Sequence, residues 1–201
     1  MLYAYVGRIA DAASLGRRVI AVDPLSGTTY LPLAFSHWLD GRFDLALEVL
    51  ERACRVRPGD RWVELTKASL LIIMGRRAEA LALTDRAERD EQLTIVHRMA
   101  LLWRYASVGD REKALSWLSP EAVQTCRRDF AFSWDLACGY AMLGDADRAL
   151  DWLENAIEYG FLNHRYLGEI DPLLAPLRGD PRFQALMIRA REKQAEFEAR
   201  P

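Results

Sequence analysis

Residues 134–156 read WDLACGYAMLGDADRALDWLENA, and this stretch decides the fold. Leu136, Tyr140 and Leu143 recur at helical spacing before Gly144, and a second apolar pattern of the same period follows it. A single glycine between two amphipathic helices can take the left-handed conformation that ends the first one. The stretch therefore predicts a helical hairpin.

The same hairpin pattern recurs along the chain. Its turn glycine occurs at Gly7, Gly41, Gly75, Gly109 and Gly144, with spacings of 34, 34, 34 and 35 residues. An alanine follows five residues after each glycine, at Ala12, Ala46, Ala80, Ala114 and Ala149. Small residues at one register allow close helix packing, and one hairpin alone cannot bury both of its faces. The repeats therefore predict a quasi-one-dimensional stack.

These residues are similar to the tetratricopeptide repeat family. The similarity is carried by Gly41 through Pro58 and by Leu136-Ala137, Tyr140, Gly144-Asp145, Ala149, Leu153 and Ala156. It implies an all-α, right-handed superhelix of about five hairpins, with the array in residues 1–160 and capping helices in residues 161–201.

The chain departs from the family pattern at two places. Leu102 stands where the family usually has a small residue in the first helix of a unit. Ser119-Pro120 is a helix-start signal inside the second helix of the fourth unit, so we expect a truncated helix there and a short separate helix over residues 121–127.

Both ends leave the 34-residue register. The first hairpin lacks about half of its first helix, and we expect its second helix, residues 8–22, to expose apolar surface near Ile9, Leu15 and Val19 and to favour self-association. Asp171-Pro172 and Asp180-Pro181 are predicted helix starts. The tail resembles C-terminal repeat regions of bacterial signalling proteins, which follow a cyclase, a kinase or a winged-helix domain, and this resemblance implies a regulatory piece of a longer protein.

Charge and composition restrict the functional class. The formal net charge of −2 argues against a general nucleic-acid partner. The apolar runs, such as residues 70–74, are too short to span a bilayer, so we expect no membrane partner. Cys54, Cys126 and Cys138 show neither zinc-site nor disulfide spacing, which favours a reducing compartment and a cytoplasmic location.

No catalytic constellation is readable. The histidines His37, His97 and His164 form no spaced metal-binding cluster, and the glycines form no phosphate loop. Ser69, Ser133 and Cys138 have no sequence-readable base. We therefore predict no enzyme activity, no cofactor and no metal.

A candidate binding groove comes from the resemblance, because the exposed side of each unit's first helix lines the concave surface in this family. The corresponding residues here are Leu31, Phe35, Trp38, Trp62, Leu65, Ser69, Ile72, Met99, Trp103, Trp134, Cys138 and Met142. Such apolar and aromatic side chains either form a contact site or pack between helices as core. The cationic clamp with which some family members hold a chaperone's terminal carboxylate is absent from this face.

The predicted function is that of a protein-interaction scaffold. Its groove would bind a peptide, a partner helix or a second copy of the chain. The alternative is a sensory C-terminal domain of a bacterial signalling protein that binds a small apolar ligand.

Overall fold

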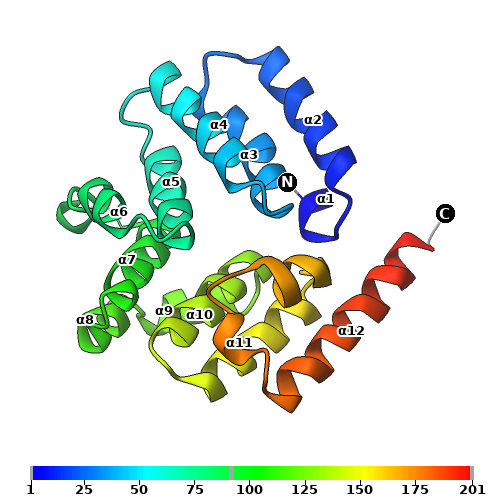
Figure 1. Ribbon diagram of the computed structural model, residues 1–201. Helices are drawn as coiled ribbons and strands as arrows, with labels where there is room; N and C mark the ends of the chain where they lie inside the picture. The colour runs from blue at the N-terminus through cyan, green and yellow to red at the C-terminus, as the bar shows by residue number, and fades with distance from the viewer. Residues whose placement is uncertain (1, 91–92, 200–201) are drawn as a thin grey trace.

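A computed structural model describes residues 2–90 and 93–199 of the chain. Within these residues the structure is helical, and the predicted stack of helical hairpins is confirmed (Figure 1). The pairs are α1 (Leu2–Tyr5) with α2 (Ile9–Val22), α3 (Leu31–Trp38) with α4 (Phe43–Val56), α5 (Arg61–Ile73) with α6 (Arg77–Thr84), α7 (Ile95–Ser107) with α8 (Arg111–Ser116), and α10 (Phe130–Met142) with α11 (Ala146–Glu158). The remaining α-helices are α9 (Pro120–Cys126) and α12 (Pro181–Glu198); short turns are η1 (Gly27–Tyr30), η2 (Ala87–Arg89), η3 (Tyr166–Ile170) and η4 (Ala175–Leu177).

The five register glycines make the hairpin turns as predicted. Their φ angles are 83° at Gly7, 79° at Gly41, 75° at Gly75, 78° at Gly109 and 72° at Gly144. A side chain at any of these positions would strain the backbone, because L-residues rarely adopt this region. The 34-residue spacing in the sequence therefore reflects one backbone requirement repeated five times.

Small residues set the distance between helices. The five register alanines are at most 2% exposed, so each second helix packs closely on its neighbours. Leu102, which is unusually large for its position, is accommodated by Gly139 on α10. A Cβ atom at Gly139 would lie 2.7 Å from Cδ2 of Leu102. The large residue in one unit is therefore matched by a missing side chain in the next.

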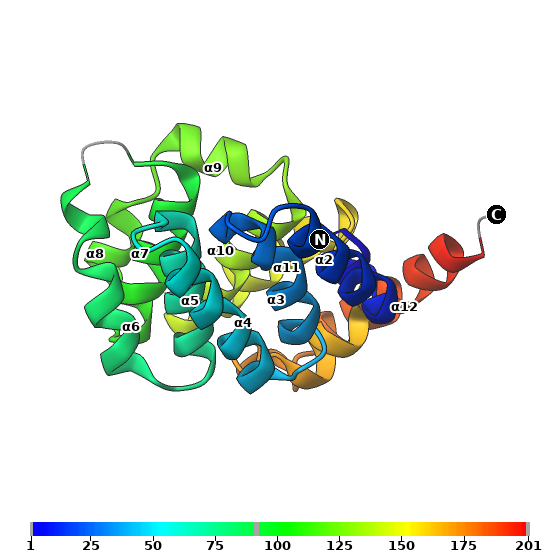
Figure 2. The same cartoon turned by 90° about the horizontal axis from the view of Figure 1, so that it is seen from above.

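The C-terminal segment joins the two ends of the stack. The backbone N–H groups of Leu162 and Asn163 both donate to the carbonyl of Tyr5, each at 2.8 Å. The Asn163 side-chain amide also donates to the carbonyls of Ala4 at 3.2 Å and Leu39 at 3.0 Å. Helix α12 then runs from α11 back toward α1, as Figures 1 and 2 show. The stack therefore closes into a ring. The domain boundary predicted at residue 160 remains a prediction.

One of the two Asp-Pro helix starts in the tail is confirmed. The Asp180 carboxylate accepts from the N–H of Arg182 and caps α12. The prediction at Asp171-Pro172 is wrong: no helix begins there, and Asp171 follows η3 with a fully buried carboxylate. Asp171 accepts the N–H of Leu173 two residues on, as in a turn, and turns toward the core instead of capping a helix.

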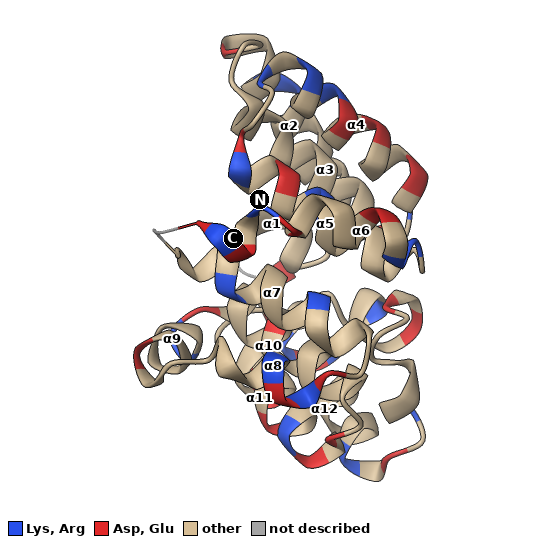
Figure 3. Ribbon diagram, turned by 90° about the vertical axis from the view of Figure 1, so that its left-hand side faces the viewer, with Lys and Arg blue, Asp and Glu red and all other residues tan. Residues whose placement is uncertain are grey.

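Charge is concentrated on the second helices of the hairpins. In Figure 3 charged residues are spread along α4, whereas α3 is tan because it contains none. Ion pairs on this outer layer attach α12 to α11, for example Arg189 to Glu158 at 2.7 Å and Lys193 to Glu158 at 3.0 Å. The first helices consequently form the apolar inner layer of the ring.

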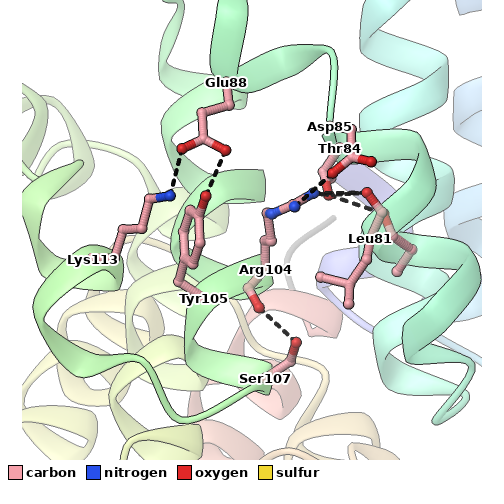
Figure 4. Close-up of polar contacts among 9 residues, drawn as sticks. Leu81, Thr84, Asp85, Glu88, Arg104, Tyr105, Ser107 and Lys113 are labelled. Atoms are coloured by element: carbon pink, nitrogen blue, oxygen red, sulfur yellow. Dashed lines mark hydrogen bonds and ion pairs between the residues drawn. The ribbon is translucent and has the colours of Figure 1, made fainter.

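Polar contacts join α6 and η2 to the fourth hairpin, α7 and α8 (Figure 4). Arg104 on α7 donates to the carbonyl of Leu81 and to the hydroxyl of Thr84, both at 2.7 Å, and so satisfies the end of the short helix α6. Glu88 accepts from the Tyr105 hydroxyl at 2.6 Å and pairs with Lys113 at 2.7 Å. These contacts secure η2 against the fourth hairpin.

The predicted interruption of the fourth unit is confirmed. Helix α8 ends at Ser116, and α9 begins after Ser119, whose hydroxyl accepts from the N–H of Ala122. Helix α9 extends over residues 120–126, within one residue of the predicted 121–127.

Candidate binding cavity

A cavity of about 430 Å³ lies on the inner side of the ring. Residues from α1, α3, α5, α7 and α10 surround it. Most of them are apolar, and seven are aromatic: Tyr5, Phe35, Trp38, Trp62, Phe130, Phe132 and Trp134. Its volume is within the range of about 300–1,000 Å³ that is usual for ligand sites.

Two tryptophans form a fixed part of the wall. The indole N–H of Trp38 donates to the Tyr166 hydroxyl at 2.8 Å, and that of Trp134 donates to the Asp171 carboxylate at 2.8 Å. The two rings meet edge to face, with centroids 6.0 Å apart. Phe35 stacks on Trp38 at 5.4 Å. Because their polar ends are satisfied by the C-terminal segment, these rings present apolar surface to the cavity.

Trp62 differs from the other cavity tryptophans because it is 47% exposed. It lies in the first turn of α5, where the Asp60 carboxylate caps the helix by accepting the N–H of Val63. A large aromatic side chain held on a capped helix at the edge of an apolar cavity is typical of a binding surface.

Asp129 and Asp135 are the two carboxyl groups of the cavity wall. Asp129 caps α10 by accepting the N–H groups of Ala131 at 2.8 Å and Phe132 at 3.0 Å. Burial raises the pKa of the Asp135 carboxyl group well above its usual range, and the charge of Asp129 raises it further. Burial also raises the pKa of the Tyr5 hydroxyl, and the charges of Asp135 and Asp129 raise it further.

Comparison with known families identifies the repeat. The family described as tetratricopeptide repeat matches residues 27–52, which include η1, α3 and most of α4, and residues 131–155, which include most of α10 and α11. The chain contains tetratricopeptide repeats. Both matches fall on hairpins whose first helices, α3 and α10, line the cavity.

A solved structure of a repeat protein matches the chain at low sequence identity. It is the crystal structure of YrrB, described as a TPR protein with an unusual peptide-binding site. The match has 15% identity and a TM-score of 0.46, and covers 93% of this chain and 96% of that chain. No curated protein matches the chain significantly. The resemblance of the tail to bacterial signalling proteins remains a prediction.

The repeat register places seven of the twelve predicted groove residues at the cavity. They are Phe35, Trp38, Trp62, Leu65, Ser69, Met99 and Trp134. Leu31, Ile72, Trp103 and Cys138 are buried outside the lining, and Met142 is half-buried. Trp103 lies directly behind the wall, where its indole N–H donates to the backbone carbonyl of Asp135 at 2.8 Å. Their role in binding remains a prediction.

The sequence reasoning missed the N-terminal and polar parts of the lining. Tyr5 is brought to the cavity by ring closure, which no local pattern indicates. Phe130 and Phe132 occupy the first turn of a tetratricopeptide helix, and their aromatic character was an available signal. Asp129 and Asp135 were passed over because only apolar groove positions were sought.

The side chains considered as nucleophiles are all engaged or buried. The Ser133 hydroxyl donates to the carbonyl of Cys126 at 2.7 Å, and Ser69 donates to the carbonyl of Leu65 at 3.2 Å. Burial raises the pKa of the Cys138 thiol, which is the wrong direction for a nucleophilic thiolate. The structure therefore assigns these three residues packing and hydrogen-bonding roles.

The described part of the chain has neither a metal-binding cluster nor a membrane-spanning helix. Among residues 2–90 and 93–199, no three histidine, cysteine or carboxylate side chains lie close enough together to hold a metal ion. In the same ranges no helix has both the length and the apolar character needed to cross a membrane.

Proposed function

We propose that this tetratricopeptide repeat ring binds a peptide of a partner protein in the cavity between α1, α3, α5, α7 and α10. One observation carries the proposal: the cavity has aromatic walls and is bordered by the half-exposed Trp62. Exposed tryptophan beside a concave apolar surface is a common energetic anchor of protein interfaces.

The cavity is suited to binding because its walls are already organised. Trp38 and Trp134 have their indole N–H groups satisfied by Tyr166 and Asp171, so a ligand need not order them. Pre-organised surfaces bind more tightly because less side-chain freedom is lost. Apolar side chains of the occupant would pack on these rings, and the interaction would be geometric and hydrophobic without bond making or breaking.

The test is selection of binding peptides from a random display library against the full chain, followed by affinity measurements on variants. Trp62→Ala should weaken a selected peptide by about thirtyfold, the equivalent of roughly 2 kcal/mol for an interface anchor. Tyr159→Ala is the matched control, since Tyr159 is 54% exposed and lies outside the cavity lining. Failure to select any peptide, or equal losses in both variants, would contradict the proposal.

Self-association through the first hairpin is a second form of protein binding that we propose for the same chain. On α2, Leu15 is 39% exposed and Val22 is 86% exposed, while Ile9 and Val19 are half-buried. The C-terminal segment covers the α1 side of this hairpin through Asn163. Sedimentation equilibrium at high micromolar concentration tests this idea, and a concentration-independent monomer mass would contradict it.

A further inference from the structure

The carboxylate of Asp135 has no partner among the described residues. Its backbone carbonyl accepts the Trp103 indole N–H, but no hydrogen bond or ion pair engages its side chain within the described ranges. The other carboxylate of the wall, Asp129, uses Oδ1 to cap α10. Within the described residues, Asp135 is therefore the carboxyl group of the lining with neither oxygen engaged.

No lysine or arginine is among the described residues that line the cavity. A negative charge in a largely apolar wall is unfavourable, which agrees with the raised pKa of Asp135. A positive charge placed beside Asp135 would remove this cost. An anionic occupant would instead face two carboxylates with no compensating cation.

The aromatic walls also favour a cation. Trp38, Trp62 and Trp134 line the cavity together with Tyr5 and Phe130. The faces of such rings attract ammonium and guanidinium groups, most strongly for tryptophan. Lysine and arginine also have long apolar stems that can pack on aromatic surface while the charged end reaches a carboxylate.

We propose that the peptide bound in this cavity presents a lysine or arginine side chain to Asp135, with apolar neighbours packed on the surrounding rings. The inference deepens the proposed function and depends on it. The volume of about 430 Å³ gives room for one long basic side chain and an adjacent apolar one. The charged contact selects the peptide, and the aromatic contacts supply most of the buried area.

The test uses the selected peptides and a double-mutant cycle. Basic residues flanked by apolar ones should be enriched among peptides selected by the full chain. Replacing the basic residue of one such peptide with norleucine should weaken binding to the unaltered protein about tenfold or more. In the Asp135→Asn variant the same replacement should change the affinity by less than about twofold, because the contact between the basic side chain and the carboxylate is already lost. Asp147→Asn, an exposed carboxylate on α11 outside the lining, controls for general charge and should behave as the unaltered protein.

Each outcome separates the two proposals. Selected peptides without basic enrichment, or norleucine peptides that bind the unaltered protein equally well, would overturn the charge assignment while leaving peptide binding intact. If the norleucine replacement lowers the affinity equally for the Asp135→Asn variant and for the unaltered protein, the assignment to Asp135 is overturned. Absence of any selected peptide would overturn both. Norleucine replacement measured on the unaltered protein still tests the need for a basic side chain if Asp135→Asn folds poorly.

Discussion

Two tryptophans from adjacent units, Trp62 and Trp103, should lose very different amounts of stability on truncation. Both lie on first helices of hairpins, yet Trp62 is 47% exposed and Trp103 is 1% exposed. Trp103 also packs edge to face on Trp134 at 5.4 Å and donates its indole N–H to the carbonyl of Asp135. Trp103→Ala removes core, whereas Trp62→Ala removes surface.

The expected magnitudes follow from this burial. Trp103→Ala should lower the free energy of unfolding by about 3–5 kcal/mol. The substitution leaves a cavity in a closed interior and removes the hydrogen bond to the backbone carbonyl of Asp135. Trp62→Ala should cost about 1–2 kcal/mol, because about half of its side chain is already in water and no closed cavity forms. For a chain of this length the corresponding losses of Tm are about 6–20 °C and about 2–8 °C.

Urea unfolding followed by far-ultraviolet circular dichroism measures both variants, since linear extrapolation gives the difference in free energy directly. The helical content of the folded Trp62→Ala protein should equal that of the unaltered chain. Equal destabilisation of the two variants would refute the reasoning, because Trp62 would then be part of the core and could not serve mainly as a contact. A larger loss for Trp62→Ala would refute the structural assignment of both residues.

Three further predictions concern the core, the closing segment and the groove chemistry. Burial raises the pKa of Asp171 from 3.8 to about 6, so its folded form binds a proton more strongly than its unfolded form. The free energy of unfolding should therefore gain about 2–3 kcal/mol from this group as the pH falls from about 7 to about 4. Urea titrations at several pH values should show that Asp171→Asn lacks this gain. Gly139→Ala should destabilise the fold by about 1–3 kcal/mol because its Cβ would meet Leu102, and the loss should shrink in a Leu102→Ala background. A peptide ending in Glu-Glu-Val-Asp should not bind, since the groove lining contains no cationic clamp; calorimetric titration giving a micromolar, strongly salt-dependent constant would contradict this.

The hairpin stack could be predicted because its causes are local. A glycine with positive φ, such as Gly144, and a small residue such as Ala149 are each required by contacts within a unit or with its neighbour. Requirements of this kind repeat with the unit and are visible as a period in the sequence. The interruption at Ser119-Pro120 was predictable for the same reason, since a helix cap involves residues only three apart.

Ring closure could not be predicted because its contacts join distant parts of the chain. Trp38 and Tyr166 are 128 residues apart, and Asn163 and Ala4 are 159 apart. Nothing in the local pattern of residues 161–171 distinguishes a segment that returns to the first hairpin from one that only covers the last. The local rule for Asp171-Pro172 even predicted a helix, and tertiary burial of the carboxylate prevailed over it.

Closure changes how the apolar first helices should be interpreted. In an open superhelix, Trp38, Trp134 and Cys138 would all face the concave groove, and their apolar character would require a ligand to explain it. In the ring, Tyr166 and Asp171 cover these three side chains. An open array needs a separate cap at each end, whereas here the first and last units cover each other. Burial by the chain itself therefore accounts for most of the apolar surface. Burial leaves two residues of one cavity lining unexplained: the half-exposed Trp62, and Asp135, whose side chain has no hydrogen-bond or ion-pair partner among residues 2–90 and 93–199.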